Sequence, residues 1–320
     1  MNNVKKIILL VLTAVSITNC NSSVEKKNDL QEAKLKSKVK SVKTTSYKVI
    51  EKFGEIKRGK TTDLEWIFDK ILNFTEGLYV YNREGNVIEK NRYNSDGSLS
   101  WKVVYKYDNK GNVIEENNYD SDGNPNEKRI YKYDDKGNKI EENYYGSDGS
   151  LELKTVYKYD DKEDVTEESN YDFEGNLNWK MTYKYDDKGN QIEANQYGSG
   201  GGLKEKTIYK YDDNKNLIQL NLYFYNGNLK WKMTYKYDDK SKVVEDNEYN
   251  SDGSHKEKTT YKYNDKDNVT EMNTYNSDRG AESRITFKYE FDTKGNWVKI
   301  IIYEDDIPEN IIEREIEYYE

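Results

Sequence analysis

The stretch Tyr131-Lys132-Tyr133-Asp134-Asp135-Lys136-Gly137-Asn138 decides the fold, because its pattern recurs along most of the chain. The step between successive copies is constant at 26 residues (131 − 105 = 26). Tyr-x-Tyr tripeptides begin at Tyr79, Tyr105, Tyr131, Tyr157, Tyr183, Tyr209, Tyr235 and Tyr261, and Phe287-Lys288-Tyr289 is the last member. A fixed period of this length is the signature of a tandem array of supersecondary units. We therefore expect one repeated unit over residues 79–296.

Each unit contains two turn signals, seen as Asp134-Asp135-Lys136-Gly137-Asn138 and as Asn94-Ser95-Asp96-Gly97-Ser98. Both place glycine where a type I turn with a G1 bulge needs a left-handed residue. Between the turns, large apolar side chains alternate with Lys and Thr, as in residues 179–185. Alternation with a period of two predicts β-strands. The fold class is therefore all-β, built from tandem antiparallel β-hairpins.

Turn geometry predicts the strand register. Pairing the residues that flank each three-residue loop sets Tyr107 opposite Val113, Tyr105 opposite Glu115, and Tyr93 opposite Leu99. One face, the tyrosine face, then collects Leu99, Trp101, Val103, Tyr105, Tyr107, Val113, Glu115, Asn117 and Tyr119. The opposite face collects Lys102, Val104, Lys106, Ile114, Glu116 and Asn118, and we expect it to be solvated.

The length of the array predicts curvature. Roughly twenty strands spaced ~4.8 Å apart would form a ribbon on the order of 95 Å long. Open sheets of more than about ten strands usually curl, and a twist of about 20° per strand accumulates to more than one turn. Curling with the tyrosine face inward would bury that face. We expect a coiled single-sheet meander or β-shell with atypical end units.

Composition limits the function classes. Only 34% of the chain is hydrophobic and 35% is charged, but the 31 tyrosines favour pleated sheets over disorder. The net charge of −9 combines many residues of both signs and gives no basic footprint. Nucleic acid is therefore not an expected partner.

The N-terminus predicts export. Lys5 and Lys6 precede an apolar run over residues 7–15 and a polar end, which is the layout of a signal peptide over residues 1–20. Ile17-Thr18-Asn19-Cys20 resembles the bacterial lipobox, although Asn19 stands where Gly, Ala or Ser is usual. The resemblance implies that Cys20, the single cysteine, carries the lipid at the mature N-terminus. We expect a protein anchored to the outer membrane of the cell envelope.

Three further segments flank the repeats. Residues 21–37 are polar and rich in lysine, which predicts a flexible tether. Residues 38–78 would form an N-terminal cap, with a helix near 63–74 that starts at the capping box Thr62-Asp63-Leu64-Glu65, or a strand in its place. Residues 297–320 predict a closing hairpin whose turn contains Pro308.

The segment Tyr131 to Asn138 resembles the YD repeat of the RHS family, and the likeness recurs over residues 79–296. RHS proteins build coiled β-shells, so the resemblance implies the same curling. The Asp-Gly turns are also similar to MORN-type repeats, and residues 38–54 are similar to the opening of Bacteroidota-type lipoproteins with such arrays. These likenesses imply an envelope location and a binding role.

The candidate binding residues are aromatic. Trp101, Trp179 and Trp231 fall in one repeat column that elsewhere holds Glu127, Leu153, Glu205 and Glu257. A column that accepts Glu is not fully buried, and aromatic rings beside polar groups suit sugars, although plain packing explains the same residues. The neighbouring tyrosine column adds Tyr105, Tyr183 and Tyr235 to the candidate site.

Other chemistry has simpler explanations. His255, the single histidine, stands in a column filled elsewhere by leucine, so it is a column variant. The Ser-Asp-Gly turns offer too few carboxylates for a good Ca²⁺ site. We expect no cofactor, no metal and no catalytic residue, and a binding or scaffolding surface for an envelope protein or a glycan. The rival is a glycoside hydrolase that uses paired carboxylates of the column Glu89, Glu115, Glu141, Glu167, Glu193, Glu245 and Glu271.

Overall fold

A computed structural model describes residues 27–62, 76–278 and 280–320. Within these residues the chain forms one short helix, α1 (Asp29–Glu32), and 21 antiparallel strands of a single sheet. The strands of the two ends are β1 (Val39–Lys52), β2 (Glu55–Thr61), β3 (Gly77–Tyr81), β19 (Ala281–Phe291), β20 (Trp297–Glu304) and β21 (Ile307–Tyr318). The all-β expectation is confirmed.

The 26-residue units form a regular run of hairpins in which every strand pairs with the next. The turn that follows each Tyr-x-Tyr is called the first turn, and the turn at the opposite end of the strands, as at residues 94–98, is called the second turn. The strands are β4 (Val87–Tyr93), β5 (Leu99–Tyr107), β6 (Val113–Tyr119), β7 (Pro125–Tyr133), β8 (Lys139–Tyr145), β9 (Leu151–Tyr159), β10 (Val165–Asp172), β11 (Leu177–Tyr185), β12 (Gln191–Gly198), β13 (Leu203–Tyr211), β14 (Leu217–Phe224), β15 (Leu229–Tyr237), β16 (Val243–Tyr249), β17 (His255–Tyr263) and β18 (Val269–Asn276).

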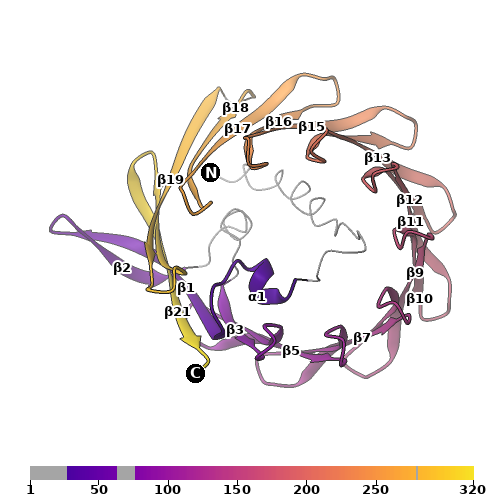
Figure 1. Ribbon diagram of the computed structural model, residues 1–320, viewed down its shortest axis with the longest axis horizontal. Helices are drawn as coiled ribbons and strands as arrows, with labels where there is room; N and C mark the ends of the chain where they lie inside the picture. Colours follow the sequence, from indigo (N-terminus) through magenta and orange to yellow (C-terminus); the bar gives the residue numbers. More distant parts are fainter. Residues whose placement is uncertain (1–26, 63–75, 279) are drawn as a thin grey trace.

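The sheet closes into a barrel, which corrects the expectation of a coiled meander or open shell. Strand β1 pairs with β21 along one edge and with β3 along the other, so the last strand is joined to the first repeat. β2 pairs only with β1 among the described strands, and the other 20 strands form the ring. Figure 1 shows this ring, with the β1–β2 hairpin projecting outward from it. Closure leaves the ring without free edges, which open sheets must protect.

A bulge beside each turn corrects the predicted register. Tyr107 lies opposite Val113 and Tyr93 opposite Leu99, as expected, but the register then shifts by one residue. Tyr105 therefore lies opposite Glu116, and Lys106 lies opposite Glu115. A bulge places two residues of one strand against one of its partner. Glu115, Asn117 and Tyr119 consequently leave the tyrosine face and join the opposite one, while Glu116 and Asn118 take their places.

The tyrosine face is the inner face of the barrel, as predicted. Helix α1 lies inside the ring (Figure 1). Its Leu30 is buried with Tyr81 and Val87, and Tyr79 and Tyr105 pack around them. In the part of the chain that the structure describes, the inner face runs continuously through the Tyr-x-Tyr side chains. The outer face carries the Lys and Glu columns.

The segment before β1 is not a tether up to residue 37. Asn28 caps α1 and donates from its Nδ2 atom to the carbonyl of Glu84 at 2.7 Å, while the Leu30 N–H donates to the carbonyl of Gly85 at 3.0 Å. The Lys36 N–H donates to Asn296 Oδ1 at 2.8 Å. The segment is therefore fixed to two first turns. The expected signal peptide, Cys20 and the helix near 63–74 lie outside the described residues.

The two ends of the chain make the seam of the barrel. Ile300, Ile302 and Ile312 are at most 2% exposed and pack with Phe287 and Trp297. The expected closing hairpin is present, but its turn is Asp305-Asp306, both with positive φ, and Pro308 lies in β21 opposite Tyr303. Residues 297–320 thus supply two strands, β20 and β21, and β21 closes the ring by pairing with β1.

Candidate binding site

The outer face is a ladder of ion pairs. Glu115 Oε1 lies 2.6 Å from Lys106 Nζ, and its Oε2 lies 3.2 Å from Lys128 Nζ in the next unit. Hydrogen bonds from Lys106 and Asn117 lower the pKa of Glu115 to about 2. The same arrangement recurs at Glu141, Glu167, Glu193, Glu245 and Glu271. The glutamates expected on the tyrosine face are therefore outer ladder elements that remain ionised.

The inner face is held by tyrosine hydroxyls that link neighbouring units. Tyr133 Oη donates to the backbone carbonyl of Val113 at 2.7 Å, 20 residues earlier in the chain. The bond recurs as Tyr107 to Val87, Tyr159 to Lys139, Tyr185 to Val165, Tyr211 to Gln191, Tyr237 to Leu217, Tyr263 to Val243 and Tyr289 to Val269. Burial raises the pKa of Tyr237 to about 12, so its hydroxyl stays a donor at neutral pH. This second tyrosine of each unit is a structural residue.

The first tyrosine of several units faces an acidic side chain across the pair of strands. Tyr131 Oη donates to Glu116 Oε2 at 3.2 Å, and Tyr261 Oη donates to Asp246 Oδ2 at 2.7 Å. The expected binding residues Tyr105, Tyr183 and Tyr235 belong to this row. Burial and the nearby Glu168 raise the pKa of Tyr183. The row supplies aromatic surface and carboxylates together on the inner face.

The three candidate tryptophans lie on the inner face near the rim formed by the second turns. Trp101 is 39% exposed, while Trp179 and Trp231 are half-buried. Trp101 and Trp179 are separated by six strand spacings, or about 29 Å along the sheet at ~4.8 Å each. Trp179 and Trp231 are separated by four spacings, or about 19 Å. The structure therefore brings the tryptophans to one face and one rim, where they alternate with Glu127, Leu153, Glu205 and Glu257 in the same row.

One sector of the inner face is strongly acidic. Glu248 and Glu257 lie directly opposite each other on β16 and β17, and each is 8% exposed. Lys256 Nζ pairs with Glu248 at 2.8 Å. Burial, outweighing a hydrogen bond from Tyr261, raises the pKa of Asp246 to about 6. Sequence reasoning missed this sector, because the one-residue bulge shift places Asp246 and Glu248 on the inner face.

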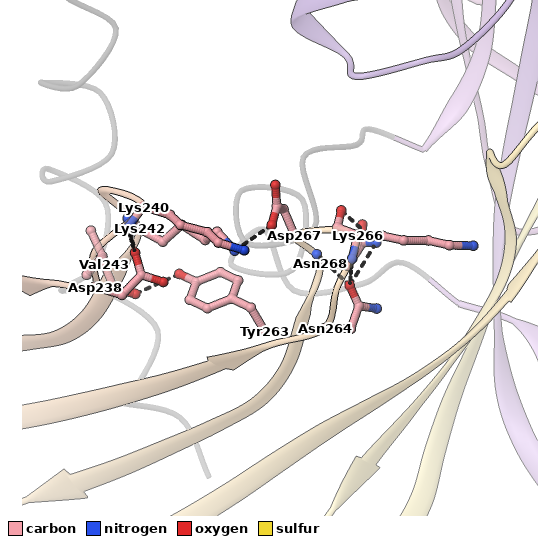
Figure 2. Close-up of polar contacts among 9 residues, drawn as sticks. All are labelled: Asp238, Lys240, Lys242, Val243, Tyr263, Asn264, Lys266, Asp267 and Asn268. Atoms are coloured by element: carbon pink, nitrogen blue, oxygen red, sulfur yellow. Dashed lines mark hydrogen bonds and ion pairs between the residues drawn. The ribbon is translucent and has the colours of Figure 1, made fainter.

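The rim formed by the first turns has a different character. Figure 2 shows two neighbouring first turns, in which Asp238 accepts the N–H groups of Lys240 and Lys242, and Lys242 Nζ lies 2.5 Å from Asp267 Oδ1. A pocket of about 540 Å³ lies between these turns and includes Tyr261 and Tyr263 in its lining. Of its charged lining groups, Lys242 pairs with Asp267 of the next turn, and Lys262 pairs with Glu271 at 2.7 Å. This pocket therefore indicates how adjacent units are joined, and its chemistry does not select a ligand.

No arrangement of three or more His, Cys, Asp or Glu side chains suited to a metal ion occurs in residues 27–62, 76–278 and 280–320. Over the same ranges, no helix has the length and apolar character needed to cross a membrane.

Comparisons with known proteins give structural likeness only. No family model matches the chain, and no curated protein matches it in sequence. A porin-like protein from Bacteroides uniformis is 12% identical with a TM-score of 0.35, covering 88% of this chain and 99% of that one. A porin-like protein from Bacteroides vulgatus is 9% identical with a TM-score of 0.31 over 88% and 99%. The crystal structure of TcdB2-TccC3 is 12% identical with a TM-score of 0.31, and this chain spans 18% of it. At these values the likenesses carry no argument about activity.

Proposed function

We propose that this chain is a non-enzymatic binding protein of the cell envelope, held to the outer membrane by a lipid on Cys20, whose ligand is a glycan or an envelope protein. The ligand contacts the inner face at the rim of the second turns. The lipobox-like residues 17–20 support the anchor. The YD-like and MORN-like repeats agree with a binding role, although no family match supports that resemblance.

The observation that carries the proposal is the row of Trp101, Trp179 and Trp231 on the inner face. A barrel of eight strands is filled by its own side chains, whereas barrels of about 16 or more enclose a lumen. Twenty strands therefore leave a lumen inside the ring, where α1 also lies, and Trp101 is 39% exposed while Tyr235 is buried. Amphipathic aromatic rings next to carboxylates such as Glu205 offer both stacking and hydrogen bonding.

The charge of the outer face supports a barrel that lies in water beside the membrane. A barrel that spans a bilayer presents an apolar band outward. Here the outer face carries ion pairs such as Lys132 with Glu141 at 2.7 Å. Placing these charges against lipid tails would be costly. The lipid anchor, rather than the barrel wall, accounts for membrane attachment in this proposal.

The test compares the mature wild-type protein with a variant in which Trp101, Trp179 and Trp231 are all alanine. Binding to envelope glycans and purified envelope proteins would be titrated. Each tryptophan that contacts ligand should contribute on the order of 1 kcal/mol. Ile140→Ala on the outer face is the control, because Ile140 is 37% exposed and lies away from the row. Equal affinity of the triple variant and the wild type would reject the tryptophan row as the site.

Glycoside hydrolysis is the second candidate, and one observation favours it. The pKa of Asp246, raised to about 6, suits a general acid, whereas the outer glutamates with a pKa of about 2 do not. Asp246→Asn would abolish turnover of a glycan substrate if this reading were right. Binding without any turnover in the wild type would exclude it.

A further inference from the structure

Exposed aromatic side chains stand at the tips of two second-turn hairpins. Phe173 in the β10–β11 turn and Tyr225 in the β14–β15 turn are each 70% exposed, and Phe224 beside Tyr225 is 40% exposed. Other units carry serine at the same turn position, for example Ser95 and Ser147. The turn therefore does not require an aromatic residue. Phe173 and Tyr225 thus stand exposed at the same position of their hairpins without serving the turn.

The hairpin between these two has a tip almost without side chains. Its turn reads Gly198-Ser199-Gly200-Gly201-Gly202. Gly201 has φ +74°, which explains one glycine. Gly200 and Gly202 lie outside the left-handed region, and a Cβ atom at either would meet nothing within 4 Å. The unit at residues 146–150 has Asp148 and Ser150 at these positions. The fold thus does not require glycine at positions 200 and 202. The two glycines leave the tip of this hairpin with few side chains.

The three hairpins lie side by side, because β10 to β15 pair in consecutive order. Phe173 and Tyr225 are separated by four strand spacings, or about 19 Å. On the inner side of the same hairpins lie Trp179 and Trp231. Lys230 Nζ lies 2.5 Å from Glu205 Oε1, so the one carboxylate that stands between them in the tryptophan row is paired.

We infer that these hairpins form a saddle for a neutral, linear glycan that crosses the rim. The saddle consists of Phe173, Trp179, residues 198–202, Tyr225 and Trp231. This inference rests on the proposed function and names its ligand class and entry point. Rings at both ends of the saddle stack on the apolar faces of sugars, and the bare glycine turn leaves room for a thin chain between them. A globular protein partner would instead need a continuous apolar core to its interface, which the glycine turn interrupts.

The test is calorimetric titration of the full mature protein with four neutral linear hexasaccharides, made of glucose, xylose, mannose or N-acetylglucosamine. Phe173→Ala and Tyr225→Ala should each weaken binding of the preferred sugar by about fivefold. Gly200→Gln should weaken it further by filling the saddle, with no packing conflict in the fold. Phe53→Ala is the matched control, because Phe53 is 93% exposed on the β1–β2 hairpin and outside the saddle.

Each outcome decides a separate point. Binding that falls in the saddle variants and is unchanged in Phe53→Ala supports the inference. Binding that survives the saddle variants but falls when Trp101 is replaced overturns the saddle and leaves the proposed function intact. Failure of the wild type to bind any of the four sugars overturns the neutral glycan, and the proposed function then depends on an envelope protein captured through the tryptophan row.

Discussion

The repeats and the seam hold the same barrel together by different chemistry. Along the repeats, each unit is joined to the next by a tyrosine hydroxyl on the inside and a Lys–Glu–Lys bridge on the outside. At the seam, Ile300 and Ile312 are 0% exposed and face each other across β20 and β21. The largest fully buried side chains of the described residues are Ile300, Ile302, Ile311, Ile312, Val39, Thr259 and Ser46. All of them except Thr259 belong to β1, β20 and β21.

This difference follows from the distance that each contact spans along the chain. Contacts between neighbouring units are local, so small repeated interactions suffice. The seam joins β1 to β21, which are more than 250 residues apart (312 − 46 = 266), and closing so long a loop costs conformational entropy. A dense apolar cluster supplies the extra free energy there. Four measurements test this comparison.

The largest effect is expected for Ile312→Ala. Removing a fully buried isoleucine should lower the free energy of unfolding by about 2–5 kcal/mol. Ile140→Ala, at an exposed position of the repeats, should change it by less than about 0.5 kcal/mol. Urea unfolding followed by circular dichroism gives both values. Similar losses in the two variants would remove the distinction between seam and repeats.

Gly137→Ala tests the turns that define the repeats. Gly137 has φ +94°, and an alanine forced into the left-handed region should cost about 1–2 kcal/mol. Gly200→Ala is the matched control, since Gly200 lies outside that region and its added Cβ meets nothing within 4 Å. Thermal unfolding of both variants measures the difference. A stable Gly137→Ala protein would show that the turn tolerates side chains without strain.

Tyr133→Phe tests a single bond between units. Loss of the hydroxyl leaves the carbonyl of Val113 without this donor, and stability should fall by about 0.5–1.5 kcal/mol. Tyr225→Phe, on an exposed tip, should have no effect on unfolding. If the two substitutions behave alike, the hydroxyl bonds contribute nothing to the joining of repeats.

The smallest effect is expected at the outer ladder, through Glu115→Gln. Hydrogen bonds from Lys106 and Asn117 hold the pKa of Glu115 at about 2, below the ~4.3 of an unfolded chain. Its contribution is therefore present above about pH 4.5 and lost as the pH falls toward 2. Solvent screening limits it to less than about 1 kcal/mol. Urea titrations at pH 6 and pH 2.5 should show a larger difference between variant and wild type at pH 6 than at pH 2.5.

The sequence predicted the repeated parts of the fold well. The spacing of Tyr131 from Tyr105 gave the unit, and the glycine found in most turns gave their position, since both are local signals. Strand bounds such as Leu177–Tyr185 agree with the expected alternation. The inward tyrosine face was also predicted, because an amphipathic sheet curls to bury its aromatic side.

The closure of the barrel and the register of its strands could not be predicted from such local signals. Closure depends on the pairing of β1 with both β21 and β3, a contact between the two non-repeating ends. Register depends on the bulge between Lys106 and Tyr107, which moves Glu115 outward and Glu116 inward. A shift of one residue exchanges the faces of a strand. The candidate tryptophans kept their inner position because each lies on the same strand as its Tyr-x-Tyr, as Trp101 does with Tyr105, while the extra residue of this bulge lies on the partner strand between Val113 and Glu115.

The hydroxyl bond from Tyr133 to Val113 has an evolutionary consequence, because the same two positions are joined in each pair of adjacent units. Duplicating or deleting one unit in the gene would leave every such bond intact and would change the ring by two strands, or about 3 Å in diameter at ~4.8 Å per strand. The bore of the barrel could thus be altered in steps by unequal recombination. The same two strands, β20 and β21, would still close the wider or narrower ring.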